Sequence, residues 1–142
     1  MRYDCGSISL EFPIGWFDTT IDDLPLTLSK TDGVGALQFS VATYKQGSSP
    51  AIDVAALGSM VLEFAKTSSL GPLRDQVQMQ GDLALVAASF SADGHTHGRV
   101  WYVSDGWSLA KITYVCEQAP PQLELREAEQ IVRSLQFSPS DA

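Results

Sequence analysis

The sequence is poor in basic residues, and this shortage argues against proteins that bind polyanions. Nine Lys and Arg residues stand against seventeen Asp and Glu residues, which gives a net charge of −8. The nine basic residues are scattered singly, so no basic stripe is available to neutralise the phosphates of nucleic acids or anionic lipids. We therefore expect neither nucleic-acid binding nor membrane binding.

Cysteines and long apolar runs are also scarce. Two cysteines, Cys5 and Cys116, cannot form the disulfide framework of a small secreted fold. The first residues, MRYDCGSISLEFP, lack the continuous apolar stretch of a secretory signal, and Cys5 lacks the apolar segment that precedes a lipoprotein cysteine. No run is long enough to span a bilayer. These absences predict a soluble, cytoplasmic protein with reduced thiols.

The length and composition fit one hydrophobic core. A chain of 142 residues, 44% of them hydrophobic and 18% charged, has the balance of a globular domain and is too short for two ordinary ones. The apolar patterns end at Phe137, and SPSDA follows. We predict a single globular domain over residues 1–137 and a disordered C-terminal tail over residues 138–142.

Alternating apolar residues predict strands in the first third of the chain. SISLEF, residues 7–12, has the alternation of a half-buried strand. Two further runs flank Asp32-Gly33, a dipeptide that tolerates the backbone angles of a two-residue hairpin turn. This turn sets Leu28 opposite Leu37 and Leu26 opposite Phe39. Pro25 cannot donate a ladder hydrogen bond, so the first strand of this hairpin is expected at or near a sheet edge.

Residues 82–116 predict a three-stranded meander with turns at Asp93-Gly94 and Asp105-Gly106. With two-residue loops, Phe90 lies opposite His97 and Trp101 opposite Ala110. Ala84, Val86 and Phe90 then share a face with Trp101. Both faces of the meander are apolar, so both need cover.

Two helical stripes supply that cover. Residues 50–66 carry Val54, Leu57, Val61 and Phe64 at helical spacing, with Ser49 as the expected N-cap and Pro50 at the first helical position. Residues 121–135 carry a second stripe, and Glu124, Glu127 and Glu129 are interpreted as its solvated surface charge. The predicted fold class is α+β, a twisted, mainly antiparallel sheet flanked by helices on both faces, an α/β/α sandwich.

His95, His97 and Cys116 are the candidates for chemistry. The predicted register places both imidazoles on one side of a strand and Cys116 opposite His95, so the three could hold a divalent transition metal, or Cys116 and His95 could form a nucleophile pair. The alternatives are a solvated hairpin tip and a packing cysteine. No nucleotide-binding glycine motif or serine elbow is present. We expect no catalytic residue, no metal and no cofactor.

Aromatic residues and charge suggest binding. Trp16 and Phe17 are adjacent in a predicted loop and Trp107 follows a predicted turn, so all three could anchor a protein interface or serve the core instead. The net charge of −8 could steer the domain toward a basic protein partner, or could only maintain solubility.

The order of elements resembles that of a known family. "FPIGWFDTT" follows a first strand, "ALQFSVATY" forms a later one, and "EAEQIVRSLQF" ends the chain, which is similar to the PsbP/Mog-like fold family and its bacterial DcrB-like branch. The resemblance implies a largely non-enzymatic role, such as a protein-complex subunit, a small-GTPase binder, or a chaperone or adaptor for secreted effectors. It carries over only Trp16 as a functional residue.

The leading hypothesis is therefore a non-catalytic protein-binding domain, an effector chaperone or adaptor or an immunity-type protein. Two alternatives stay open. One is a metal-dependent or thiol enzyme centred on His95, His97 and Cys116. The other is a small-ligand carrier with a pocket between helix and sheet.

Overall fold

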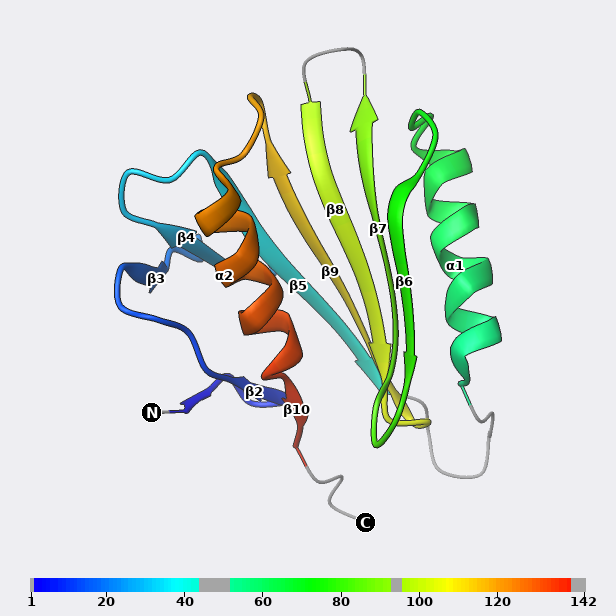
Figure 1. Ribbon diagram of the computed structural model, residues 1–142. Coiled ribbons are helices and arrows are strands. Elements are labelled where there is room, and N and C mark those ends of the chain that lie inside the picture. The colour runs from blue at the N-terminus through cyan, green and yellow to red at the C-terminus, as the bar shows by residue number, and fades with distance from the viewer. Residues whose placement is uncertain (1, 44–51, 93–95, 139–142) are drawn as a thin grey trace.

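A computed structural model describes residues 2–43, 52–92 and 96–138 of the chain (Figure 1). A seven-stranded sheet in the order β3-β4-β5-β9-β8-β7-β6 has only antiparallel neighbours, and a small sheet in the order β1-β2-β10 lies beside it. In chain order the elements are β1 (Tyr3–Asp4), β2 (Ile8–Leu10), β3 (Trp16–Asp18), β4 (Leu26–Lys30), β5 (Gly35–Thr43), α1 (Val54–Thr67), β6 (Arg74–Gln80), β7 (Ala84–Ala92), β8 (Thr96–Ser104), β9 (Ser108–Cys116), α2 (Gln122–Arg133) and β10 (Gln136–Phe137).

The two helices lie on opposite faces of the large sheet, which confirms the predicted fold class. Figure 1 shows α2 crossing one face and α1 standing against the other beside β6 and β7. Each face has its own apolar cluster. The α2 face gathers residues such as Trp101, Ile112 and Ile131, and the α1 face gathers residues such as Leu57, Val61 and Val100.

The β4–β5 hairpin has the predicted register. Leu26 pairs with Phe39 and Leu28 with Leu37. The turn closes through a 2.8 Å hydrogen bond from the backbone N of Gly33 to the carbonyl O of Lys30, with Asp32 at a φ of 59°. β4 is the second strand from the sheet edge, next to β3, as Pro25 predicted.

The predicted register of β7 against β8 is wrong by one residue. Ala92 pairs with Thr96, so three residues separate the paired ends instead of two, and Phe90 lies opposite Gly98 instead of His97. A shift of one residue turns a strand over. Leu85 and Ala87 therefore face α2, while Ala84, Val86 and Phe90 face α1. The turn itself, residues 93–95, lies outside the described residues.

The predicted register of β8 against β9 is wrong by two residues, which preserves the faces. Trp101 pairs with Ile112 instead of Ala110. The loop is longer because side chains close it: Asp105 Oδ1 accepts hydrogen bonds from the backbone N of Trp107 and Ser108, at 2.9 and 2.7 Å. Gly106 supplies the positive φ, 100°, that the loop requires.

The predicted stripe of α1 is confirmed, with Leu57 and Val61 buried. The N-cap, however, is Asp53, whose side chain accepts a 2.9 Å hydrogen bond from the backbone N of Ala56. The helix thus begins later than predicted, and the expected cap Ser49 and Pro50 lie outside the described residues.

The edge strand β6 was not predicted. Its residues are exposed apart from the partly buried Val77, so it has little of the apolar alternation that marks a strand. Its pairing with β7 shifts between Arg74 and Val77, where Asp75 has a φ of 51°. Of the predicted tail, residues 138–142, only Ser138 lies within the described residues; its backbone N donates to the carbonyl O of Ser7 at 2.9 Å.

Candidate functional site

The structure places Cys116 directly opposite His97. The Cys116 thiol is buried and donates to the backbone carbonyl O of His97 at 3.5 Å. Burial raises the pKa of this thiol, so it is protonated at neutral pH, whereas a nucleophilic cysteine must be a thiolate. The contact with His97 therefore involves its backbone and a packing cysteine, which gives the thiol-enzyme alternative no support.

The predicted metal ligands are only partly described. His95 lies outside the described residues, so its position relative to His97 and Cys116 is not described. Across residues 2–43, 52–92 and 96–138, no three His, Cys, Asp or Glu side chains come together as the ligands of a metal ion would. The predicted trio gains no support from the described pair.

Of the three aromatic residues considered for an interface, Trp16 takes the alternative role in the core. It lies in β3 with only 2% of its surface exposed, and its Nε1 donates to Glu127 Oε1 at 3.2 Å. Trp16 belongs to the core, because its ring packs in the cluster on the α2 face. Phe17 and Trp107 are exposed, but they lie on different elements, edge strand β3 and the β8–β9 loop.

The interpretation of the α2 glutamates as solvated surface charge is wrong. Glu124 is only 3% exposed and accepts hydrogen bonds from the backbone N of Val34 and of Gly35, each at 3.1 Å, and from the Tyr114 hydroxyl at 2.5 Å. Burial, followed by the Glu124 hydrogen bond, raises the pKa of Tyr114, so this hydroxyl stays a neutral donor. Glu124 thus fastens the first turn of α2 to the β4–β5 turn and to β9.

Glu127 forms a second attachment between α2 and the sheet. Its Oε1 lies 2.5 Å from Lys30 Nζ and also accepts from Trp16 Nε1. The Lys30 ammonium is the main cause that holds the pKa of Glu127 below its usual value. Because the carboxylate already binds two groups of the domain, it is poorly suited to act as a free acid or base.

Glu129 is the third attachment, and three donor groups share it. One of its oxygens accepts from Trp101 Nε1 at 2.6 Å and lies 3.5 Å from Arg133 Nε, and the other lies 3.3 Å from Arg99 Nε. Glu129 and Arg133 are four residues apart on α2 and form an ion pair. A single carboxylate therefore faces two guanidinium groups.

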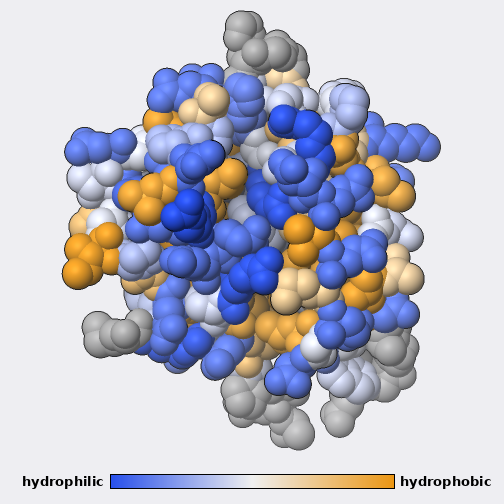
Figure 2. Space-filling view, in the orientation of Figure 1, coloured by the Kyte–Doolittle hydropathy of each residue, from blue (hydrophilic) through white to orange (hydrophobic). Residues whose placement is uncertain are grey.

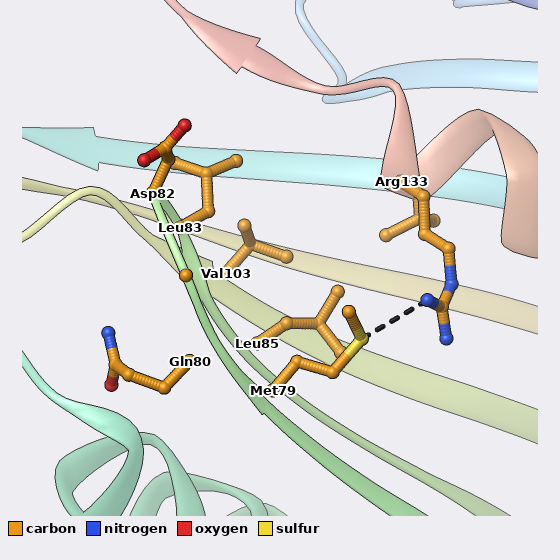
Figure 3. Close-up of a pocket in the computed structure, with 9 residues that line it drawn as sticks. Met79, Gln80, Asp82, Leu83, Leu85, Val103 and Arg133 are labelled. Atoms are coloured by element: carbon orange, nitrogen blue, oxygen red, sulfur yellow. Dashed lines mark hydrogen bonds between the residues drawn. The ribbon is translucent and has the colours of Figure 1, made fainter.

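A groove runs along α2 on the side of the sheet that ends in β6, and we call it the α2–β6 groove. At one end lies a shallow hollow of about 650 Å³. At the other is a smaller and more apolar pocket of about 280 Å³, shown in Figure 3, where Arg133 of α2 donates to Met79 Sδ at 3.1 Å across the opening. The hollow is lined by Asp75, Gln76, Val77, Ser89, Arg99, Gln122, Leu125, Arg126 and Glu129, and the apolar pocket by Met79, Gln80, Gly81, Asp82, Leu83, Leu85, Val103, Val132 and Arg133.

The groove combines apolar surface with an unusual share of the cations. Figure 2, which views the molecule from the α2 side, shows apolar patches surfacing among hydrophilic side chains. Arg99, Arg126 and Arg133 line the groove, and Arg2 lines a hollow that continues it past Arg133. Four of the nine basic residues of a chain with a net charge of −8 thus gather along one side of α2.

Sequence reasoning missed the groove because it missed β6, which forms one wall. The available signal was weak: Val77 and Met79 alternate with three glutamines in the run QVQMQ, residues 76–80. Met79 is 43% exposed and Leu83 is partly buried. From its sequence alone, such a segment is predicted to be a polar loop. Its few apolar residues gain a role only when the fold places them beside a helix.

Comparison with known proteins identifies the fold. No protein-family model matches the chain, and no curated protein matches it. The solution structure of cyanobacterial PsbP (CyanoP) from Synechocystis sp. PCC 6803 is similar at a TM-score of 0.64 and 10% identity, over 97% of this chain and 92% of that one. A crystal structure of a protein from Bacteroides thetaiotaomicron VPI-5482 is similar at a TM-score of 0.62 and 14% identity. The alignment covers 96% of this chain but only 47% of the Bacteroides protein, so the chain spans about half of its length. The chain has a PsbP-like fold.

Proposed function

We propose that the chain is a non-catalytic protein-binding domain of the DcrB-like branch of this fold, a bacterial cytoplasmic protein that acts as an effector chaperone or adaptor or as an immunity-type protein. The observation that carries the proposal is the α2–β6 groove, which leaves apolar side chains of a sheet face accessible beside a helix. Exposed apolar surface rimmed by polar groups is typical of protein interaction sites. Within the described residues, no helix is long and apolar enough to cross a membrane.

The groove is a better docking surface than the open edge of β6. β6 is the last strand of the large sheet, and such an edge can accept an added strand. The pairing shift between Arg74 and Val77 and the positive φ of Asp75 distort that edge, which is how natural sheets discourage edge pairing. A partner segment is therefore expected to lie on the face between α2 and β6.

The absence of catalysis is part of the proposal, and the use of the acidic groups supports it. Glu124, Glu127 and Glu129 each accept hydrogen bonds from groups that hold the domain together. Cys116 is buried, with a raised pKa. These are the groups that sequence patterns would nominate for acid-base or thiol chemistry, and their environments favour attachment and packing instead.

The net charge of −8 supports a basic partner. Attraction between an acidic domain and a basic protein acts at long range and is screened by salt. The association rate is therefore expected to fall as ionic strength rises, whatever the contacts formed inside the groove.

Co-purification with the products of neighbouring genes tests the proposal. The tagged chain should form a complex with one of them that survives size-exclusion chromatography. Met79→Glu, which adds a charge to the groove, should weaken the complex. Leu62→Glu adds the same charge to an exposed apolar residue of α1 and should not. If no neighbouring product binds, the proposed function fails; if one binds and both variants bind it as the unmodified chain does, the groove is not the docking surface.

A further inference from the structure

The α2–β6 groove contains an arginine that the domain leaves incompletely paired. Arg99 is only 6% exposed, and its Nη1 donates to the carbonyl O of Asp75 and to Ser89 Oγ, both at 2.9 Å. Its Nε has no hydrogen bond and is sealed from solvent, despite the nearby Glu129 carboxylate. Nη2 makes no hydrogen bond to the described residues and is not among the sealed atoms. A nearly buried guanidinium therefore presents unused donors to the hollow.

The cations around Arg99 have few ion-pair partners. Glu129 is shared with Arg133, so one carboxylate faces two guanidinium groups. Arg126 lines the same hollow and forms no ion pair within the described part of the chain, and the Asp75 carboxylate there forms none either. In the lining of the hollow itself, Arg99 and Arg126 are matched in number by Asp75 and Glu129, so what favours an incoming carboxylate is the set of unused donors on Arg99 and not an excess of positive charge. Burying a charge without a full set of partners is costly, so an incoming carboxylate would be favoured.

The apolar pocket lies further along the same groove, beyond Glu129. On the β6 side, residues 75–77 line the hollow and residues 79–82 line the pocket. The two centres are therefore about four residues apart, or roughly 13 Å at about 3.3 Å per residue of strand. Its volume of about 280 Å³ suits one large apolar side chain, and Figure 3 shows Leu83, Leu85 and Val103 at its base.

We propose that the groove binds an extended peptide segment of the partner, in which a carboxylate side chain pairs with Arg99 and Arg126 and an apolar side chain about four residues away fills the pocket. The inference rests on the proposed function and specifies the chemistry of the partner. The carboxylate can accept one hydrogen bond from Arg99 Nη2 and others from the exposed Arg126, and such hydrogen bonds between ionised groups are about twice as strong as neutral ones. The partner can be basic overall, because only the inserted segment must carry the carboxylate.

Peptide selection on the intact chain tests this inference. A phage-displayed library of random peptides should yield sequences with Asp or Glu about four positions from a large apolar residue. A labelled consensus peptide should then bind in fluorescence polarisation. Replacing its acidic residue with the matching amide, or using the chain with Arg126→Gln, should weaken binding roughly tenfold, the loss expected for a charge-assisted hydrogen bond. Lys66→Gln, an equal charge change on α1, should alter binding less than about twofold.

Arg99→Gln should have an effect at least as large as Arg126→Gln. Because Arg99 is nearly buried, its variant is first checked for an unchanged urea midpoint, whereas Arg126 is exposed and gives an independent readout. The inference is overturned if the consensus peptide has no acidic residue, or if Arg126→Gln leaves the affinity for the peptide unchanged. Either result leaves the proposed function standing. A spacing of about nine residues would indicate a helical ligand and also overturns it. A failure to select any peptide rejects the extended segment, while co-purification judges the proposed function separately.

Discussion

Replacing Glu124 with glutamine tests whether a buried carboxylate fastens α2 to the sheet. The side chain is 3% exposed, and no cation lies within ion-pair distance of it in the described structure. Its charge is instead met by three donors, the backbone N of Val34, the backbone N of Gly35 and the Tyr114 hydroxyl. Glu124→Gln keeps the shape, removes the charge and introduces an NH2 group that must point at one of these donors.

The sign of the effect depends on two opposing contributions. Neutralising the carboxylate removes the cost of burying a charge. Against this, hydrogen bonds to an ionised group are about twice as strong as neutral ones, so each of the three donors loses about 1 kcal/mol, and the backbone N of Val34 keeps only one of its two acceptor oxygens. We expect the second contribution to win by about 2 kcal/mol, which at this chain length lowers Tm by roughly 6 °C.

Urea unfolding followed by circular dichroism measures the change, provided that the m value stays constant. Glu63→Gln, an exposed residue of α1, makes the same charge change without a buried partner and should leave the midpoint in place. Tyr114→Phe removes one donor, and the double variant should cost less than the two single variants together. An unchanged or raised midpoint for Glu124→Gln would show that desolvation dominates and would refute the argument.

Three further predictions concern packing at glycines, the loss of stability at acid pH and the reactivity of the thiols. Gly98→Ala should destabilise by about 2 kcal/mol in urea unfolding, because its Cβ would lie 2.4 Å from Phe90 Cζ and 2.6 Å from the Tyr114 carbonyl O. Gly58→Ala, whose Cβ would meet only a side-chain atom at 3.9 Å, should stabilise α1 by up to about 1 kcal/mol, and the reverse order would contradict the packing. Because folding lowers the pKa of Glu127, its carboxylate contributes stability that is fully present above its ordinary pKa of 4.5 and is lost as pH falls through the folded pKa. Lys30→Gln should reduce this loss of stability at acid pH. If the variant and the unmodified chain show the same dependence of the urea midpoint on pH, the Lys30–Glu127 ion pair is not the cause of the loss. Burial raises the pKa of the Cys5 thiol to about 11 and also raises that of Cys116, so both should react slowly with Ellman's reagent at pH ~8 and quickly once unfolded; a fast native thiol would revive the thiol-enzyme hypothesis.

The sequence predicted those parts of the fold where two independent signals coincide. The β4–β5 hairpin combines a turn dipeptide with strict alternation, and its pairing is as expected, although the turn closes one residue earlier than predicted, from the backbone N of Gly33 to the carbonyl O of Lys30. The strand over residues 84–92 has apolar residues on both faces, and such a strand carries no alternation to fix its register. The predicted register of this strand therefore depended only on the length of the β7–β8 turn. That turn is one residue longer than predicted, so the faces of the strand are exchanged.

The candidate site was harder to predict, because it contains charged residues that are buried although charged residues are usually exposed. Glu124 lies four residues before Ala128 and eight before Val132, so helical spacing does place it on the buried stripe. An acidic residue on a stripe is ordinarily taken for surface charge, and its three donors come from distant parts of the chain. Likewise, Arg99 and Arg126 lie on different elements, and only the packing of α2 against the sheet brings them to one groove.

The pairing of β5 with β9 also sets the order in which the protein can be assembled. β5 emerges from the ribosome long before residues 108–116, which are its only partner on that side. Until β9 arrives, the β4–β5 hairpin has an unpaired flank of nine residues that can mispair with other nascent chains. Refolding should therefore be slow and limited by this long-range closure, and truncated chains that end before β9 should aggregate instead of forming a smaller sheet.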